Sequence, residues 1–318
     1  MVTTSYATEA LPRPRRSFVP ASLLQWLTWA LVVTLVLGPF LPLLYASLRD
    51  RPLYEAGGVF TIEPYRELFG QRAFWHAWWN TLQFAALTTG LAVSLGAAAA
   101  ILCARTDLPG RRAFSRLVLL PLLLPSLGMV LGWIAVWGDG GYATSFFHQR
   151  LHIGTPAIDT IAGMSLVEAT RLMPVAFLTC QAALVRADSS LEDAARSAGA
   201  SPIRVLRSVT IPMLRPALLN AATLIFTLSI AVLGIPLLLG VPNNIQFVSS
   251  YLYTLWTNAS SPDPGSVSAG AMLLLVAATI LHPWNEELVE RDGVIGARDW
   301  NGLRRRLDPV LERIDQPA

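Results

Sequence analysis

Charged residues are scarce in this chain of 318 residues: they make up 14% of it, whereas 53% is hydrophobic and the mean hydropathy is +0.48. A soluble domain carries about 25% charged residues. The composition therefore excludes an ordinary soluble globular protein and indicates an integral membrane protein.

Lysine is absent, and all 24 basic residues are arginine. The formal net charge of +3 is too small to indicate a partner such as nucleic acid. Cysteine is nearly absent as well. Cys103 and Cys180 both lie in apolar runs, so the sequence predicts neither a disulfide framework nor a cysteine-based metal site.

Long apolar runs are abundant, and a membrane-spanning helix needs about 20 such residues. We expect spans at 23–48, 80–103, 114–137, 157–184, 217–240 and 267–281. The predicted fold class is all-α, a polytopic transmembrane bundle of about six helices. Pro39 and Pro42 should kink the first span, and Pro121 and Pro125 mark expected bends in the third.

The arginine distribution predicts the orientation. Dense clusters fall in 1–22, 104–113, 186–216 and the segment after 282, whereas the loops at 138–156 and 241–266 hold one arginine and none. Arginine accumulates in cytoplasmic loops. We therefore expect both termini and the segment 186–216 in the cytoplasm. The loop at 49–79, with four arginines, is placed outside by parity.

The segment 186–216 is a polar island between two apolar runs. Ser189 and Glu192 have the spacing of a capping box at a helix start. Strong helix formers follow at Ala194, Ala195 and Ala198. Gly199 stands where a left-handed residue would end that helix at no steric cost.

A second helix is expected directly after this turn. Ser201 and Pro202 suit the N-cap and the first helical position, and Pro212 and Pro216 should end the helix. Most segments of this kind are solvated loops between helices. The small alanines, however, would let another surface approach closely.

The spacing of this segment resembles the EAA loop of binding-protein-dependent ABC importer permeases, which reads E-A-A, three residues, G, nine residues, I-x-L-P. The matching residues here are Asp193, Ala194, Ala195, Gly199, Val209, Ile211 and Pro212. Asp193 stands for the Glu of the family pattern, Val209 for the Ile and Ile211 for the Leu.

The resemblance covers about residues 23–281 and implies the MetI-like type I importer permease fold. GIPLLLGVPNNIQFVSSYLYTLW and DPGSVSAGAMLLL are similar to the iron(III) branch, whose relatives include thiamine and polyamine permeases. In that branch two six-helix repeats are usually fused, and this chain resembles the first half. The implied substrate is iron(III), with polyamine, thiamine, phosphonate or another small solute as alternatives.

The domains that we expect are a cytoplasmic arm at 1–22, a permease domain at 23–282 and a charged tail at 283–318. The tail departs from the family pattern. With the short last span, it indicates a truncated, frameshifted or rearranged C-terminus. The alternative is a genuine half-size permease with an amphipathic cytoplasmic helix near 300–314.

The resemblance implies a mechanical role for the segment 186–216. It would dock onto a dimer of ATP-binding subunits, which hold the ATP, so that this chain needs no cofactor. A periplasmic or lipoprotein binding protein would deliver substrate, and a second permease half, self or paralogue, would complete the pathway in the bacterial inner membrane. The implied coupling residues are Glu192, Asp193, Ala194, Ala195, Ala198, Gly199, Val209, Ile211 and Pro212. Glu192 or Asp193 would accept hydrogen bonds or meet an arginine of the ATP-binding subunit.

Two ionisable residues, Glu168 and Arg171, lie in the fourth expected span, three apart and so on one helix face. Charges at membrane depth are costly and normally face a partner or a wet cavity. The pair either lines the pathway or a gate, or is a mutual ion pair near the outer end of the helix. His148 and His152 have the i, i+4 spacing of two metal ligands, but no third ligand accompanies them, so we expect no metal site.

Two other classes of membrane protein fit the sequence less well. A membrane-embedded enzyme would need paired catalytic groups, and the chain has no HExxH motif and no paired intramembrane Asp. Arg171 cannot readily give up a proton, so we name no catalytic residue. An ion-coupled secondary transporter would carry several intramembrane acids and often inverted repeats, which we do not find.

Overall fold

The computed structural model describes residues 21–51, 55, 57–152, 157–187, 190–257 and 263–280. Within these ranges the chain is helical and has no β-strand, only an isolated bridge between Arg49 and Phe60. The all-α prediction is therefore confirmed. Residues 1–20 of the expected arm and the expected tail at 283–318, with its helix near 300–314, lie outside the described residues.

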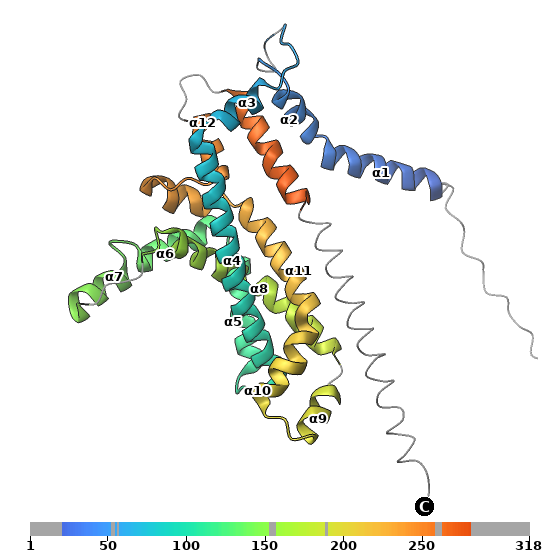
Figure 1. Ribbon diagram of the computed structural model, residues 1–318, viewed down its shortest axis with the longest axis vertical. Helices are drawn as coiled ribbons and strands as arrows, with labels where there is room; N and C mark the ends of the chain where they lie inside the picture. Colours follow the sequence, from blue (N-terminus) through green and yellow to red (C-terminus); the bar gives the residue numbers. More distant parts are fainter. Residues whose placement is uncertain are drawn as a thin grey trace, which may run out of the picture.

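Three unbroken helices are long and apolar enough to cross a membrane: α4 (Arg72–Arg105), α8 (Ile161–Arg186) and the helix Pro202–Ile230. The third is assembled from α10 (Pro202–Val205), the π-helical turn η2 (Leu206–Thr210) and α11 (Ile211–Ile230). Figure 1 shows α4, α8 and α11 side by side at the centre of the molecule. α8 begins after Thr160, whose Oγ1 accepts a hydrogen bond of 3.1 Å from the Gly163 amide.

Small residues let α4 and α8 approach closely. A Cβ atom placed on Gly96 of α4 would lie 2.6 Å from the carbonyl oxygen of Met173 and 2.7 Å from the Cβ of Ala176, both on α8. Ala92 of α4 is fully buried in a cluster that also contains Ala169. Such small residues at helix interfaces are how membrane helices gain van der Waals contact where lipid offers no hydrophobic driving force.

The first and third expected spans are bent. α1 (Ala21–Leu37) and α2 (Phe40–Ser47) meet at 42°, with Gly38 and Pro39 at the break, so the predicted kink is confirmed at Pro39, whereas Pro42 lies inside α2.

The bend expected in the third span, over 114–137, is confirmed at Pro125 and not at Pro121. α5 (Arg111–Leu123) and the helical stretch Ser126–Leu151 meet at 107°. That stretch comprises α6 (Ser126–Trp137), α7 (Tyr142–Phe146) and η1 (Phe147–Leu151). The bend lies at Leu124 and Pro125, because a residue before proline is driven out of the helical region and Leu124 has ψ 135°. Pro121 lies inside α5.

The chain after α11 is also more broken than expected. α11 ends at Ile230, ten residues before the predicted end at 240, and η3 (Pro236–Gly240) and η4 (Val241–Asn243) follow. α12 (Val248–Thr257) was not predicted. The last expected span corresponds to the short apolar helix Pro264–Ile280. By length and composition the described residues hold three spans, or five if each bent pair is one span.

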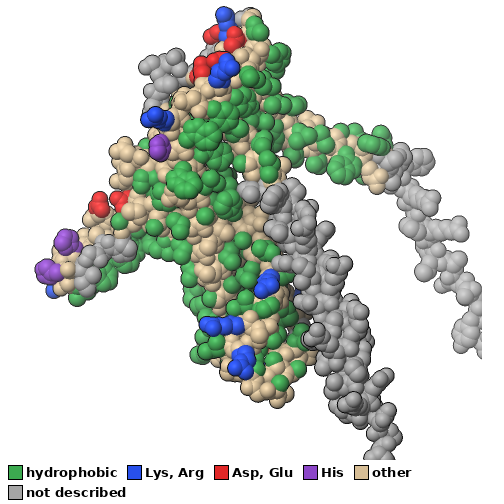
Figure 2. Space-filling model, viewed as in Figure 1, with side chains coloured by type: hydrophobic (Ala, Val, Ile, Leu, Met, Phe, Trp, Pro, Cys, Tyr) green, Lys and Arg blue, Asp and Glu red, His purple; other side chains and the backbone are tan. Residues whose placement is uncertain are grey.

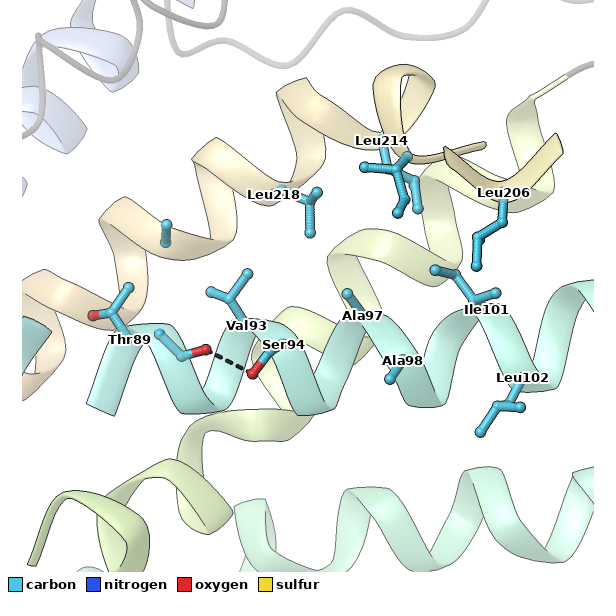
Figure 3. A pocket seen from close by; sticks show the side chains of 13 residues that line it. Thr89, Val93, Ser94, Ala97, Ala98, Ile101, Leu102, Leu206, Leu214 and Leu218 are labelled. Carbon is cyan, nitrogen blue, oxygen red and sulfur yellow. Dashed lines mark hydrogen bonds between the residues drawn. The ribbon is translucent and has the colours of Figure 1, made fainter. Parts of the chain in front are cut away.

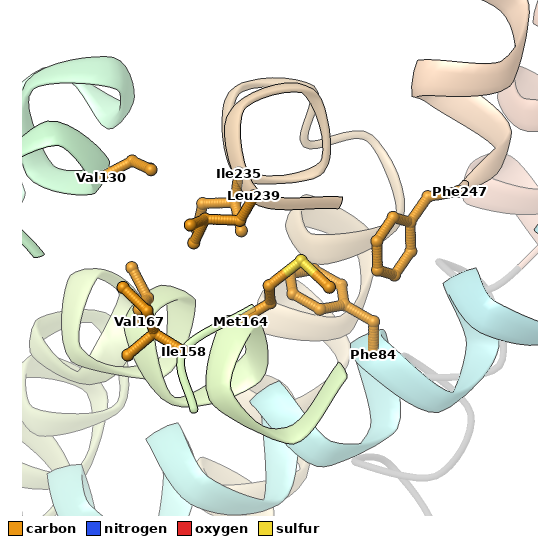
Figure 4. Packing of buried hydrophobic residues seen from close by; sticks show 8 residues of the cluster. All are labelled: Phe84, Val130, Ile158, Met164, Val167, Ile235, Leu239 and Phe247. Atoms are coloured by element: carbon orange, nitrogen blue, oxygen red, sulfur yellow. The ribbon is translucent and has the colours of Figure 1, made fainter. Parts of the chain in front are cut away.

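One end of the bundle is closed by a large apolar cluster, seen in Figure 4. Phe84 of α4, Met164 of α8 and Phe247 converge there, and η3 covers them. Two side chains of α4 bind the backbone of the segment that joins η4 to α12. Asn80 Nδ2 donates to the Gln246 carbonyl at 2.9 Å, and the Val248 amide donates to Thr81 Oγ1 at 2.9 Å. The helix α3 (Glu63–Gly70) lies at the same end (Figure 1).

The other end of the bundle packs around a second cluster. Phe177 and Cys180 of α8 meet Leu214 of α11 and Val118 of α5 there. Cys103, also in this cluster, and Cys180 are both free and buried. This end carries α9 (Ser190–Ser197) and α10, at the bottom of Figure 1.

The outer surface is largely apolar, as Figure 2 shows, and charged side chains gather at the ends of the molecule. On α1, Trp26 and Trp29 are 74% and 67% exposed. A soluble protein would not expose a whole apolar helix in this way, whereas lipid solvates it without cost.

Gly96→Ala tests the close approach of α4 and α8. We expect the variant to lose about 1–3 kcal/mol of stability, because the added methyl group meets backbone atoms that cannot move aside. The measurement is the midpoint of thermal unfolding in detergent, followed by the reaction of Cys103 and Cys180 with a fluorogenic maleimide. Gly90→Ala is the matched control on the same helix, since a Cβ there meets nothing within 4 Å. Equal midpoints for the two variants would contradict the packing described here.

Candidate functional site

The segment 186–216 folds as a helix, a tight turn and a second helix, as predicted. Gly199 has φ +84°, its amide donates to the Arg196 carbonyl at 2.9 Å, and the Ala200 amide donates to the Ala195 carbonyl at 3.0 Å. These bonds form a Schellman motif, in which a left-handed residue ends a helix. The prediction that Gly199 terminates α9 is confirmed.

The second helix starts where the sequence places it but does not end where we expected. Ser201 is the N-cap residue and Pro202 the first helical residue, although the Ser201 side chain makes no capping bond. Pro212 and Pro216 do not end the helix, which continues to Ile230. The π-helical turn η2 immediately precedes α11, and such a turn redistributes backbone hydrogen bonds where proline removes a donor.

Glu192 points into the protein and not toward a partner. Its side chain is nearly fully buried, and Oε1 accepts one hydrogen bond from Arg105 Nε at 3.0 Å and another from Thr210 Oγ1 at 3.0 Å. Oε2 faces Arg196 at 3.7 Å. Of the two acids expected to meet an arginine of another subunit, Glu192 or Asp193, Glu192 is thus occupied by arginines of its own chain. Ser189, the other residue of the expected capping box, lies outside the described residues.

Arg105 joins three elements at this point. It is the last residue of α4, it binds Glu192 of α9, and its Nη2 donates to the Leu184 carbonyl near the end of α8 at 3.3 Å. Thr210 adds η2 to the same cluster through its bond to Glu192. We call Arg105, Glu192 and Thr210 the brace. A cavity of 210 Å³ between α4 and the loop is lined by all three.

The residues next to Glu192 face outward. The Asp193 side chain is 65% exposed and pairs with the exposed Arg196 at 3.5 Å. Ala194, Ala198 and Gly199 are exposed, and a Cβ on Gly199 would meet nothing within 4 Å. Ala195 is half-buried.

The remaining motif residues lie on the second helix. Val209 belongs to η2 and Ile211 and Pro212 to the start of α11, on either side of the buried Thr210. Ile211 also lines an apolar groove of 680 Å³ between α4 and the helix Pro202–Ile230. Figure 3 shows Val93, Ala97 and Ile101 of α4 facing Leu206, Leu214 and Leu218 across this groove.

Two members of the brace were missed by sequence reasoning. Arg105 entered only as one arginine of a basic loop, and Thr210 not at all. The sequence gives no spacing signal for them, because Arg105 and Glu192 are 87 residues apart. A buried carboxylate needs a cation beside it, and this rule would have indicated an arginine partner for Glu192. The rule could not be applied, because the sequence does not show that Glu192 is buried.

Glu168 and Arg171 form an ion pair within α8. Arg171 Nε donates to Glu168 Oε2 at 2.8 Å, and Arg171 Nη2 donates to Oε1 of the same carboxylate. Glu168 is fully buried, whereas the Arg171 side chain is 20% exposed. The two residues therefore form the mutual ion pair. A role in lining the pathway stays a prediction, and it would fall to Arg171 because only its side chain is partly exposed.

The two histidines singled out by their spacing do not share a helical face. His148 lies in η1, whereas His152 follows it with φ 53°. In the described part of the chain, no group of three His, Cys, Asp or Glu side chains is arranged to hold a metal ion.

Comparison with known proteins identifies the family. Residues 90–288 match the family described as "Binding-protein-dependent transport system inner membrane component". The chain is 30% identical over 226 residues to the 2-aminoethylphosphonate transport system permease protein PhnU of Salmonella choleraesuis, covering 70% of this chain and 78% of that protein. It is also 30% identical over 257 residues to the trehalose transport system permease protein SugB of Mycobacterium tuberculosis, covering 78% and 88%.

Solved structures agree on the fold. A bacterial alginate ABC transporter, in complex with an alginate pentasaccharide-bound periplasmic protein, matches with a TM-score of 0.66 at 16% identity, covering 85% of this chain and 96% of that chain. The MetNI methionine ABC transporter in an inward-facing conformation matches with a TM-score of 0.51 at 17% identity, covering 72% and 98%. The relatives are transport permeases and not enzymes, in agreement with the absence of catalytic residues from our prediction. The chain therefore belongs to the binding-protein-dependent inner membrane components, and it is a multi-pass inner membrane permease of an ABC importer with the MetI-like fold.

Proposed function

We propose that the segment 186–216 is the coupling element through which this permease binds its ATP-binding subunit. One observation carries the proposal: Glu192 is buried in the brace, while Asp193 and Ala194 on the same short helix, and Ala198 directly after it, are exposed. One face of α9 is therefore anchored in the permease and the other is available to a partner.

The exposed face suits close docking. Ala194 and Ala198 offer little side chain, and the turn at Gly199 leaves open space around its Cα. Asp193 supplies a carboxylate that can accept charge-assisted hydrogen bonds from an arginine of the partner. The exposure of Asp193 and the burial of Glu192 support assigning this contact to Asp193.

The buried face explains how movement is transmitted. Arg105 ties α9 to the ends of α4 and α8, so a displacement of α9 acts on both long helices at once. Packed helices switch between discrete arrangements instead of deforming smoothly. In this mechanism two ATP-binding subunits close on ATP, draw two such loops together and rock the helix bundles between inward-open and outward-open states.

Val209, Ile211 and Pro212 support the loop in this proposal and do not contact the ATP-binding subunit. They surround Thr210, which donates to Glu192, at the point where the second helix continues into α11. Their role is to hold the start of α11 against α9.

The remaining partners follow from the same proposal. The arginine-rich ends of α4, α5 and α8 lie with the coupling element, which supports a cytoplasmic position for this end of the bundle. A binding protein on the opposite side would deliver the substrate. A second permease half, self or paralogue, would cover the apolar groove between α4 and the helix Pro202–Ile230.

The substrate is a small solute whose identity is set mainly by the binding protein. Two relatives at 30% identity are named for 2-aminoethylphosphonate and trehalose, which share no chemistry, and ModB of Escherichia coli, at 27%, is named for molybdenum. None of these names supports the expected iron(III). Sequence identity of about 30% supports the permease class but does not identify the transported solute.

Gly199→Trp tests the coupling role. The indole would stand in the docking face, and an overpacked contact of about 1–3 kcal/mol corresponds to about five- to 160-fold weaker binding. We expect the variant to insert in the membrane but to lose the ATP-binding subunit on co-purification in mild detergent, and to lose transport. Gly57→Trp is the matched control, because Gly57 has φ +85°, open space around it and lies in the loop before α3. Normal co-purification with Gly199→Trp would refute the coupling role.

Glu192→Gln and Asp193→Asn separate the anchored face from the docking face. The first change replaces a carboxylate that accepts a charge-assisted bond by a neutral amide, and should cost about 1–3 kcal/mol and speed trypsin cleavage at Arg196, Arg204 or Arg207. The second alters an exposed pair and should change stability by at most about 1 kcal/mol while weakening binding of the ATP-binding subunit.

Thermal unfolding, timed proteolysis and co-purification of both variants check this division. The brace is not an anchor if Glu192→Gln matches the wild type in stability and cleavage. Asp193 is not a contact residue if Asp193→Asn binds the ATP-binding subunit as well as the wild type does.

A further inference from the structure

A basic cavity of 470 Å³ lies beside the brace and is not used by the proposed coupling mechanism. It opens between the end of α4, the start of α5 and the end of α8. Its lining includes the three arginines Arg105, Arg111 and Arg112 and two neutral polar residues, Ser115 and Gln181. We call it the arginine cavity.

Two of the three arginines keep their charge uncompensated by nearby acids. Arg105 is committed to Glu192 and to the Leu184 carbonyl. In the part of the chain that the structure describes, no carboxylate lies within ion-pair distance of Arg111 or Arg112, and both are exposed. An anion entering the cavity would meet two available guanidinium groups.

The backbone adds to this positive field. α5 starts at Arg111 after Gly110, which has φ +75°, and no side chain caps this start. The free amides and the dipole at a helix N-terminus favour an anion. Gln181 on α8 brings an amide to the same space, whereas the hydroxyl of Ser115, one turn along α5, donates to Cys103 Sγ at 3.4 Å. The groups that line the cavity match a phosphate group, which accepts several hydrogen bonds and carries negative charge.

The position of the cavity points to the source of the phosphate. It lies where three apolar helices end, and basic pockets between membrane helices at this level bind lipid headgroups. Figure 2 shows basic side chains at this lower end of the bundle and no acidic ones on the face in view. Val185, also in the lining, is 77% exposed and offers an apolar surface beside the charges.

We propose that the arginine cavity binds the phosphate of an anionic phospholipid headgroup, with Arg111 and Arg112 as the principal ligands. A soluble phosphate shares this chemistry and is the alternative source that the experiment must separate. Placement of the cavity in the cytoplasmic leaflet rests on the proposed function, whereas the binding itself does not.

The test uses the purified full-length chain in neutral detergent, with phosphatidylglycerol or phosphatidylcholine titrated in and bound lipid counted by native mass spectrometry. We expect saturable binding of phosphatidylglycerol over phosphatidylcholine. The double variant Arg111→Gln/Arg112→Gln should raise the apparent dissociation constant about thirtyfold, since each basic residue near a headgroup contributes roughly a factor of five. Gln181→Glu, which keeps the side-chain shape and adds a negative charge to the wall, should weaken binding in the same direction.

Arg116→Gln is the matched control, because Arg116 is exposed on the same helix but does not line the cavity. Equal loss in this control and in the double variant, or equal binding of the two lipids, would overturn the proposal. Unchanged binding by the double variant would do the same, provided that its unfolding midpoint matches the wild type. Displacement of the lipid by millimolar inorganic phosphate would assign the cavity to a soluble anion instead. None of these readouts uses the ATP-binding subunit, so failure here and failure of the coupling role are separate results.

Discussion

The close contact of α4 with α8 is the constraint on which the rest of this permease depends. Gly96 of α4 lies directly against the backbone of α8, and small residues such as Ala92 continue the contact along the helix. In lipid there is no hydrophobic drive between helices, so the contact must come from surfaces that fit at short range. The two helices then form one rigid unit, the α4–α8 pair, against which α11 and α5 pack.

Each end of the α4–α8 pair binds a different segment of the chain. At one end, Asn80 and Thr81 of α4 hold the broken segment after α11 by hydrogen bonds to the backbone of Gln246 and Val248, one turn along α4 from Phe84. At the other end, Arg105 holds α9 through Glu192. Irregular backbone at membrane depth is tolerated only where protein satisfies it, and α4 supplies these partners at the first end. At the second end, Arg105 of α4 instead satisfies the buried carboxylate of Glu192.

Much of this arrangement could be predicted from sequence, and the failures share one physical cause. Apolar runs located the helices, and Gly199 ended α9 as expected because a left-handed turn is decided locally. Proline effects were predicted less well: Pro125 lies at a bend of 107°, while Pro216 lies inside a continuous helix. A proline removes a donor in both cases, and neighbouring structure decides whether the helix breaks. Glu192 is the clearest case, since its partner Arg105 is 87 residues away and no local pattern links them.

The described part of the chain holds two buried carboxylates, Glu168 and Glu192, and only one of them suits the proposed transmission of movement. Glu168 pairs with Arg171 three residues later on the same helix. That pair moves with α8 as a unit and does not link α8 to another element. Glu192 pairs with Arg105 on a different helix, and the pair keeps its hydrogen bonds only if α9 and α4 move together. Because breaking a buried pair leaves an uncompensated charge, the cost of separating α9 from α4 is high. In the proposed mechanism, a force applied to α9 is therefore passed to α4 and α8 through this pair, as coupling to an ATP-binding subunit requires.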